Sequence, residues 1–279
     1  WTGIHVNTPP KMKFSPHLSE IITPPSPRNG RGGRGVRDIF VFLCFLFAVG
    51  THAESLVNAK EHLLKNGLKL LIVEDHKTPR VVCRLYYKVG STYEAPGKTG
   101  LSHMLEHMMF KGTTRVGTAD FEKEKPLAKT VDSLFELSDD AFEKGDTATE
   151  KKYRTEARVA ADKQKTFLKD NELWNLYQTA GGTDLNAYTS DLLTAYIVTL
   201  PANKLELFLW LESDRMAHPV MREFYTERDV VMEERRLRYD NSPYGRYFET
   251  LSSMMFEAHP YRIPTIGYMS DLRLLKSGE

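Results

Sequence analysis

The chain has 279 residues, of which 41% are apolar and 27% are charged, and its formal net charge is +1. These values are typical of a globular protein with a sizeable core, in one large domain or two small ones. The near-neutral charge gives no indication of nucleic acid as a main partner.

The first 53 residues differ in composition from the rest of the chain. Residues 24–38 are rich in proline, glycine and arginine, residues 39–50 form an apolar run without a charge, and the small residue Ala53 follows. A basic segment, a short apolar run and a small residue, in this order, are typical of a secretory signal peptide. We therefore expect residues 1–53 to be a signal peptide with its upstream residues, and the mature chain to be exported to the periplasm or secreted.

Two alternatives for this segment are weaker. An uncleaved membrane anchor needs a longer apolar run than residues 39–50 provide, so we expect no stable membrane span after signal cleavage. A mitochondrial presequence would be amphipathic and would lack such a run. Cleavage also removes Cys44, which leaves Cys83 as the single cysteine and excludes a disulfide within the mature chain.

The next residues predict strands and then a helix. The pair Asn66-Gly67, between two apolar runs, predicts a β-hairpin over residues 62–75. The β-branched and aromatic residues of segment 80–91 predict a third strand. A loop rich in glycine and proline follows, and a helix is expected over about residues 99–112, where glycine suits the C-terminal cap.

Residues 119–170 are highly charged and rich in helix-forming residues. Apolar residues recur at helical spacing in the first part, and Gly145-Asp146 interrupts the run. This pattern predicts a hairpin of two long helices laid on the surface. Its charges are most simply interpreted as a solvated face and not as a partner site.

The remaining residues predict further strands and helices. Two strands joined by a turn near Ser190-Asp191 are expected within residues 181–201. Helices are expected over residues 203–216, 222–241 and 244–257. Because strands and helices do not alternate regularly, we expect the α+β fold class, with a largely antiparallel sheet packed against helices.

The pattern H-x-x-E-H, formed by His103, Glu106 and His107, carries the clearest chemical signal. On a helix, residues four apart are separated by about 40° around the axis and about 6 Å along it, so both imidazoles project from one face. Such a pair suits a single zinc ion, and a glutamate beside it suits proton transfer from a bound water. The apolar residues around the motif indicate a buried helix, in which histidine and glutamate need partners.

A catalytic zinc site normally has a third protein ligand. The candidates are the glutamates of residues 226–238. Glu227 and Glu234 are seven residues apart and therefore fall within about 20° on one helical face. Spacing alone does not choose between Glu227, Glu233 and Glu234.

Three segments, GLSHMLEHMMFKGT, LNAYTS and ERDVVMEERR, occur in an order that resembles the insulinase/pitrilysin family of zinc peptidases. Within that family they are most similar to the bacterial processing proteases related to mitochondrial processing peptidase. The resemblance covers most of residues 56–279. It implies a zinc-dependent endopeptidase that hydrolyses peptide bonds of peptides or unfolded polypeptides, on a pitrilysin/processing-peptidase-like domain.

The resemblance also implies roles for particular residues. His103, His107 and Glu234 would be the ligands of one zinc ion, and Glu106 would be the general base that activates a water molecule. Glu227 would be a further carboxylate that helps to position the site.

By the same resemblance, Asn186 and Ala187 lie on an exposed edge strand and would hold the substrate backbone as an added strand. Two features depart from the family. The two metal-binding segments are unusually far apart in the sequence, which identifies about residues 119–170 as an inserted helical hairpin. The family's second, similar half or partner chain, which closes the cleft, has no counterpart here, so we expect residues 54–279 to be an N-terminal catalytic domain.

Two rival functions have different consequences. A non-catalytic family subunit serving binding or assembly would usually lack part of the zinc motif, whereas all four expected residues are present here. A structural zinc site would have no use for Glu106. Zinc content combined with peptide hydrolysis distinguishes the three possibilities.

Overall fold

The computed structural model describes residues 58–278 and divides into two compact units, one ending at Glu74 and the other beginning at Asp75. The expected signal peptide and the cleavage site at Ala53 lie outside the described residues. Within the described part of the chain, no helix is both long enough and apolar enough to cross a bilayer.

The first unit contains the predicted β-hairpin. Its strands, β1 (Ala59–Leu63) and β2 (Lys69–Val73), pair antiparallel. Gly67 in the turn has a φ of 86°, which glycine adopts at little steric cost. The side chain of Asn66 accepts a hydrogen bond of 3.1 Å from the backbone N–H two residues later. The Asn-Gly pair therefore forms the turn, as predicted.

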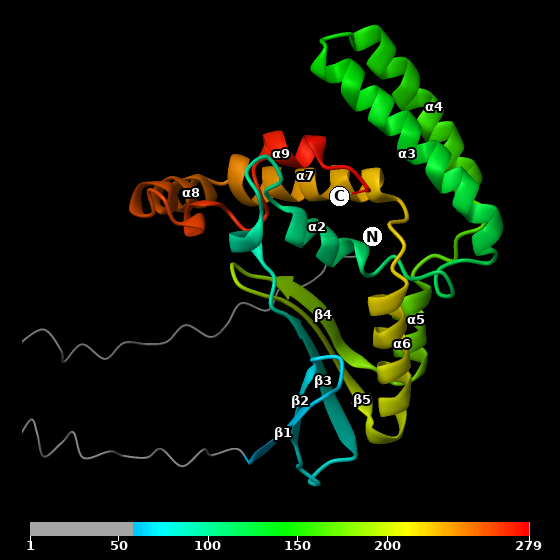
Figure 1. The fold of residues 1–279 in the computed structure, drawn as a ribbon, viewed down its shortest axis with the longest axis vertical. Helices are drawn as coiled ribbons and strands as arrows, with labels where there is room; N and C mark the ends of the chain where they lie inside the picture. Colours follow the sequence, from blue (N-terminus) through cyan, green and yellow to red (C-terminus); the bar gives the residue numbers. More distant parts are fainter. Residues whose placement is uncertain (1–57, 279) are drawn as a thin grey trace, which may run out of the picture. The chain divides into compact units, whose positions relative to one another are not determined.

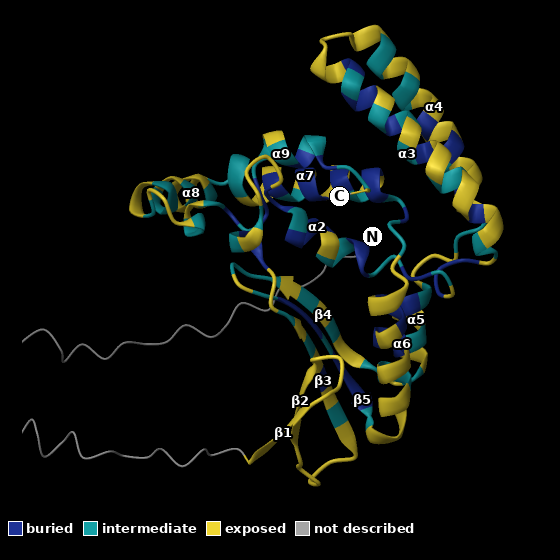
Figure 2. Cartoon of the chain, viewed as in Figure 1, coloured by how far each residue is buried: buried dark blue, intermediate teal, exposed yellow. Residues whose placement is uncertain are grey.

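The second unit is built on an antiparallel sheet of three strands, β3 (Arg80–Tyr87), β4 (Thr183–Thr189) and β5 (Thr194–Pro201), in the spatial order β3-β5-β4 (Figure 1). The central strand β5 is buried along most of its length (Figure 2). Strand β4 lies at one edge, and its pairing with β5 shifts register between Thr183 and Asn186. The predicted α+β class and antiparallel sheet are confirmed.

Helices α5 (Glu172–Thr179) and α6 (Leu205–Ala217) lie beside this sheet, and the other helices lie beyond one end of its strands (Figure 1). The latter include α2 (Leu101–Met108), α7 (Phe224–Arg235), α8 (Pro243–Met255) and α9 (Met269–Leu274). Short 3-10 turns occupy Ser91–Tyr93, Ala202–Lys204 and Pro260–Arg262, and α7 continues as a π-helical turn over Arg236–Asp240.

The charged segment folds as the predicted hairpin of two helices, α3 (Phe121–Glu143) and α4 (Thr147–Lys165). Each helix begins at an aspartate, Asp120 or Asp146, whose side chain accepts a hydrogen bond from a backbone N–H three residues later. Gly145, in the connection, has a φ of 72°. The predicted break at Gly145-Asp146 is therefore confirmed.

Two apolar clusters hold the second unit together. In the first, buried residues of α2 and α7 pack with residues of α3, α4 and α9; Met104, Val231 and Leu272 are fully buried there. In the second, β3 and β5 pack against α5 and α6 through residues such as Tyr177 and Leu200. Helices α2 and α7 therefore share one core, and the charged hairpin contributes to it.

Three details differ from the sequence predictions. The helix that carries the H-x-x-E-H residues ends at Met108, not near Gly112, because the chain tightens into a turn in which the N–H of Lys111 bonds the carbonyl oxygen of Met108. Helices α5 and α9 were not predicted. The hairpin is not solvated throughout, since Glu124 and Asp139 are buried and paired with arginines.

Candidate metal centre

Helix α2 places two imidazoles side by side. Met104 and Met108 anchor the helix in the core, and His103 and His107 project from an adjacent face one turn apart. Their ring centroids are 4.8 Å apart. Both rings are mostly buried, with 11% and 23% of the side chain exposed.

The start of α2 is fixed by a carboxylate from the preceding loop. Gly100 caps the helix with a φ of 89° and has no side chain to satisfy the first N–H groups. Glu94 replaces that cap, because its two oxygens accept hydrogen bonds of 2.7 Å from the backbone N–H groups of Gly100 and Ser102. Sequence reasoning did not identify Glu94, although it lies in the glycine- and proline-containing loop before the helix.

Helix α7 brings two glutamates to these histidines, and the two helices lie against each other (Figure 1). The oxygens of Glu234 lie 3.9 Å from His103 Nε2 and 3.5 Å from His107 Nε2. Glu227 Oε2 lies 3.4 Å from the other ring nitrogen of His107, Nδ1.

The structure distinguishes the three glutamates that spacing left open. The carboxylate of Glu233 is 58% exposed and pairs with Arg236 at 2.7 Å. Glu234 instead joins the histidines, with one ligand atom from each of the three residues lying within 4.8 Å of the others. Glu227 contacts His107 on the opposite side of its ring, at Nδ1.

A tetrahedral zinc ion fits this donor set. Zinc–nitrogen and zinc–oxygen bonds of about 2.0–2.2 Å imply ligand atoms about 3.4 Å apart. Glu234 Oε2 lies 3.5 Å from His107 Nε2, close to that separation, and one ligand atom from each of the three residues lies within 4.8 Å of the others, so the set is somewhat wider than a bound ion requires. Two imidazoles and one carboxylate are also a common protein ligand set for zinc.

Cations support the two carboxylates from outside. Lys111 Nζ lies 2.7 Å from Glu227 Oε1 and 3.0 Å from Glu223 Oε2. Arg238, one helical turn beyond Glu234, lies 2.9 Å from Glu234 Oε1. Neither cation was predicted, since their roles depend on contacts that only the fold creates.

Glu106 lies on α2 next to His107, and Thr189 holds its carboxylate. The Thr189 hydroxyl, at the end of β4, donates a hydrogen bond of 2.5 Å to Glu106 Oε2. The role of Thr189 was not predicted, although it belongs to the segment LNAYTS. This contact connects the edge strand directly to the H-x-x-E-H helix.

Asn186 and Ala187 lie on β4, three and two residues before Thr189, with Asn186 exposed. They pair with β5 on one side, while the other side of β4 has no strand partner among the described residues. The Asn186 side chain accepts a hydrogen bond of 2.9 Å from the N–H of Ala187. The structure places both residues on an open strand edge.

The surroundings of the two histidines shift their pKa values in opposite directions. Burial and the neighbouring His107 lower the pKa of His103 to about 4. Burial also opposes a charge on His107, but its hydrogen bonds and attraction to Glu227 and Glu234 raise its pKa to about 9. His107 therefore has the higher proton affinity of the two, and a metal ion at this site would compete with its proton.

The three carboxylates also differ. Burial raises the pKa of Glu106 above its usual range, although the hydrogen bond from Thr189 opposes this. Burial acts in the same direction on Glu227 and Glu234, but hydrogen bonds to His107 and the nearby cations lower the pKa of both. The ligand candidates are thus held ionised, while Glu106 is the carboxylate with the higher proton affinity.

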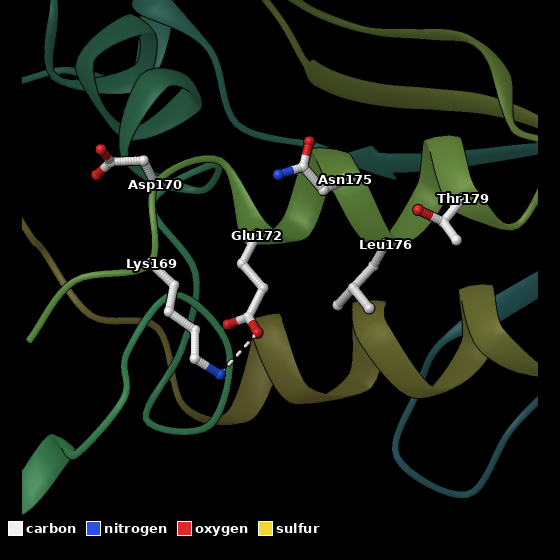
Figure 3. Close-up of a pocket in the computed structure, with 6 residues that line it drawn as sticks. All are labelled: Lys169, Asp170, Glu172, Asn175, Leu176 and Thr179. Atoms are coloured by element: carbon white, nitrogen blue, oxygen red, sulfur yellow. Dashed lines mark hydrogen bonds and ion pairs between the residues drawn. The ribbon is translucent and has the colours of Figure 1, made fainter.

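A separate pocket runs along α5 (Figure 3). Two of its charged groups are paired with each other, since Lys169 Nζ lies 3.0 Å from Glu172 Oε1, and the N–H of Gly117 donates to Glu172 Oε2 at 2.6 Å. The lining residues are Lys169, Asp170, Glu172, Asn175, Leu176 and Thr179. None of them belongs to the histidine cluster.

Comparison with known proteins points to one family. The family model described as "Insulinase (Peptidase family M16)" matches residues 69–130 and 158–268. The chain is 29% identical over 226 residues to "Zinc protease PqqE" of Helicobacter pylori, covering 80% of this chain and 39% of that protein. A stretch of 52 residues is 40% identical to the human "Insulin-degrading enzyme", covering 19% of this chain and 5% of that enzyme.

Solved structures show the same fold. A protease from Helicobacter pylori matches with a TM-score of 0.54 and 28% identity, over 79% of this chain and 41% of that one. The first half of the periplasmic protease PqqL from Escherichia coli matches with a TM-score of 0.54 and 20% identity, over 79% of this chain and 38% of that one. The chain thus spans about two fifths of the length of these relatives.

Proposed function

Because the chain belongs to the insulinase family of peptidases, peptidase family M16, we propose that it is the zinc-binding half of a metalloendopeptidase. Its substrates are peptides or unfolded polypeptides. The observation that carries the proposal is the convergence of His103, His107 and Glu234 within 4.8 Å, beside the carboxylate of Glu106 on the same helix. The naming of family members as zinc proteases supports zinc as the metal.

In the proposed mechanism, His103, His107 and Glu234 hold the zinc ion. When bound, zinc lowers the pKa of a water molecule and polarises the carbonyl of the scissile bond. Glu106 accepts the proton from the attacking water and then gives it to the leaving nitrogen. Burial raises the pKa of Glu106, which makes it a better proton acceptor.

Glu227 contributes by fixing His107. With its Nδ1 proton directed at Glu227, the imidazole presents Nε2 toward Glu234. Lys111 in turn keeps Glu227 ionised and in place. Such a carboxylate–histidine pair sets the tautomer and the orientation of a metal-binding ring.

The open edge of β4 is the proposed substrate platform. An extended peptide that pairs with Asn186 and Ala187 as an added strand continues toward Thr189, whose hydroxyl contacts Glu106. The main chain of the substrate would thereby be aligned, and the scissile bond would be brought to the metal.

We further propose that the active peptidase contains a second, homologous half or a partner chain that closes the cleft, and that the protein is exported. The greater length of the relatives supports a second half, since this chain covers only 39% of the Helicobacter pylori zinc protease. The similarity to the first half of a periplasmic protease from Escherichia coli supports both ideas. Residues 54–279 are then the N-terminal catalytic domain.

Substitutions in the purified protein test the assignment through zinc content and hydrolysis of an unstructured peptide. His107→Ala and Glu234→Ala are expected to lose zinc, whereas Glu106→Gln is expected to keep zinc and lose hydrolysis. Glu233→Gln is the matched control, because Glu233 is next to Glu234 in the sequence but its own carboxylate faces solvent. Undiminished hydrolysis by Glu106→Gln would refute the mechanism. Zinc binding without hydrolysis, both by the chain alone and with the proposed second half added, would identify a non-catalytic subunit.

A further inference from the structure

The α3–α4 hairpin reaches the helix that carries the two metal-site glutamates through a buried ion pair. Arg228 of α7 donates hydrogen bonds of 2.6 and 3.0 Å to the two carboxylate oxygens of Asp139 on α3. Both side chains are at least 96% buried. Arg228 also donates to the carbonyl oxygen of Leu275, just after α9, so it fastens α7 to two other segments.

Further contacts reinforce this connection. Tyr225, in the first turn of α7, stacks on Phe135 of α3 with ring centroids 4.3 Å apart. Arg154 of α4 pairs with Asp229 of α7 at 3.0 Å. The hairpin therefore contacts α7 through apolar packing, an exposed ion pair and a buried bidentate pair, of which the bidentate pair has the strictest geometry.

We propose that Asp139 is a positioning residue for the metal centre, which acts through Arg228 to fix the rotation of α7. The inference rests on the proposed function and assigns the hairpin a task in it. Arg228 follows Glu227 directly, so the Asp139–Arg228 pair holds α7 on a face about 100° away from the face that carries Glu227 and Glu234.

The magnitudes show why rotation matters. A carboxylate lies about 5–6 Å from the helix axis, so a rotation of about 10° moves it by about 1 Å. Metal–ligand distances in protein sites stay within about 0.2 Å of their usual values, so a shift of about 1 Å has to be made up by movement elsewhere in the site. Apolar packing of Val231 and Met232 resists translation of α7 but is less directional than two parallel hydrogen bonds. The pair is therefore suited to set the angle at which Glu234 meets the histidines.

The test measures zinc affinity by competition with a chelator, in proteins that circular dichroism shows to be folded. Asp139→Asn is expected to weaken zinc binding by about tenfold, as for other residues that orient metal ligands. Asp139→Glu, which keeps the carboxylate, is expected to recover part of this loss and serves if Asp139→Asn does not fold.

Two neighbouring residues provide matched controls. Asp140→Asn alters an exposed carboxylate that pairs with Lys276 at 3.7 Å, and Ser138→Ala removes a partly buried hydrogen bond from α3 to the carbonyl of Glu150 on α4. Both are expected to bind zinc within twofold of the unaltered protein, although Ser138→Ala lowers the stability of the hairpin.

The outcomes separate this inference from the proposed function. Folded Asp139→Asn that binds zinc as tightly as the unaltered protein would overturn the positioning role. Equal weakening by Ser138→Ala would also overturn it, because affinity would then follow hairpin stability and not the rotation of α7. Failure of the unaltered protein to bind zinc would refute the proposed function itself.

Discussion

Glu106 and Thr189 form the most direct link between the proposed base and the proposed substrate platform. The Thr189 hydroxyl donates to one carboxylate oxygen, which favours the ionised form and lowers the pKa of Glu106 against the effect of burial. In the proposed mechanism, the second oxygen of the same carboxylate would accept the proton of the attacking water. One threonine therefore adjusts both the orientation and the proton affinity of the base.

Thr189→Val tests this role. Losing the hydrogen bond is expected to raise the pKa of Glu106, so that activity is lost at a higher pH as the solution is acidified. The rate near neutral pH is expected to fall by about tenfold, roughly the worth of one hydrogen bond to a charged group, because the carboxylate loses the contact that orients it and this loss outweighs the gain in proton affinity. The measurement is the pH profile of kcat for an unstructured peptide, with zinc content determined alongside.

Thr183→Val is the control, because its hydroxyl bonds only Asp184 at the far end of β4. An acid limb at the same pH in Thr189→Val and the unaltered protein would contradict the role. So would loss of zinc in Thr189→Val, since Thr189 does not contact the proposed ligands.

The residues of the site were predictable to different degrees. His103, Glu106 and His107 follow from spacing on one helix, because the helical period alone places them together. The third ligand did not follow from spacing, and the resemblance to a family selected Glu234, which the fold brings to both imidazoles. Lys111 lies in a turn and pairs with Glu227, which is far away in the sequence, and Glu94 lies in a loop whose path decides which N–H groups it reaches, so no local pattern identifies either contact.

Among the elements, the charged hairpin shows which features a local sequence pattern predicts and which it does not. Its helices and the turn between them were predicted because helix formers, caps and a glycine are local signals. Its burial was not, because a run of charges looks solvated unless the partner residues are known. Glu124 is fully buried only because Arg222, almost a hundred residues later, pairs with it at 2.7 Å.

Arg222 also organises the turn after α2. It donates hydrogen bonds to the carbonyl oxygens of Lys111, Thr113 and Val116. Arg222→Met is expected to destabilise the protein by about 3–5 kcal/mol, because it leaves Glu124 as an uncompensated buried charge. The measurement is the free energy of unfolding from denaturation in urea.

A double variant distinguishes the effect of the buried charge on Glu124 from the effect of losing the hydrogen bonds to the turn. Arg222→Met combined with Glu124→Gln is expected to recover part of the lost stability, since no buried charge remains. Lys165→Met, which removes an exposed pair with Asp162, is the surface control and is expected to leave stability unchanged. A single Arg222→Met variant as stable as this control would contradict the assignment.

At the scale of the whole molecule, the proposed ligands and base lie within this chain, whereas the match covers only about two fifths of the relatives' length. We therefore expect the chain alone to bind zinc but to cleave peptides slowly. Addition of the proposed second half is expected to raise turnover by orders of magnitude, because ordering the substrate contributes several kcal/mol to lowering the barrier.

The experiment compares hydrolysis of one unstructured peptide by the chain alone and by the chain mixed with a separately expressed second half. The Glu106→Gln variant, mixed with the same second half, controls for activity that does not arise from this site. Full turnover by the chain alone, unchanged by the addition, would show that the cleft needs no second wall.

The register shift in β4 limits what can attach to this edge. Asp184 has a φ of 55°, and the regular pairing with β5 resumes only at Asn186. A continuous row of unpaired backbone groups on the outer edge of β4 therefore extends only from Asn186 to Thr189, the residue that contacts Glu106. A short stretch of substrate finds a template there, but a long strand does not. The same irregularity should hinder copies of the chain from stacking edge to edge into fibrils, a hazard for any protein that keeps a strand edge open for peptides.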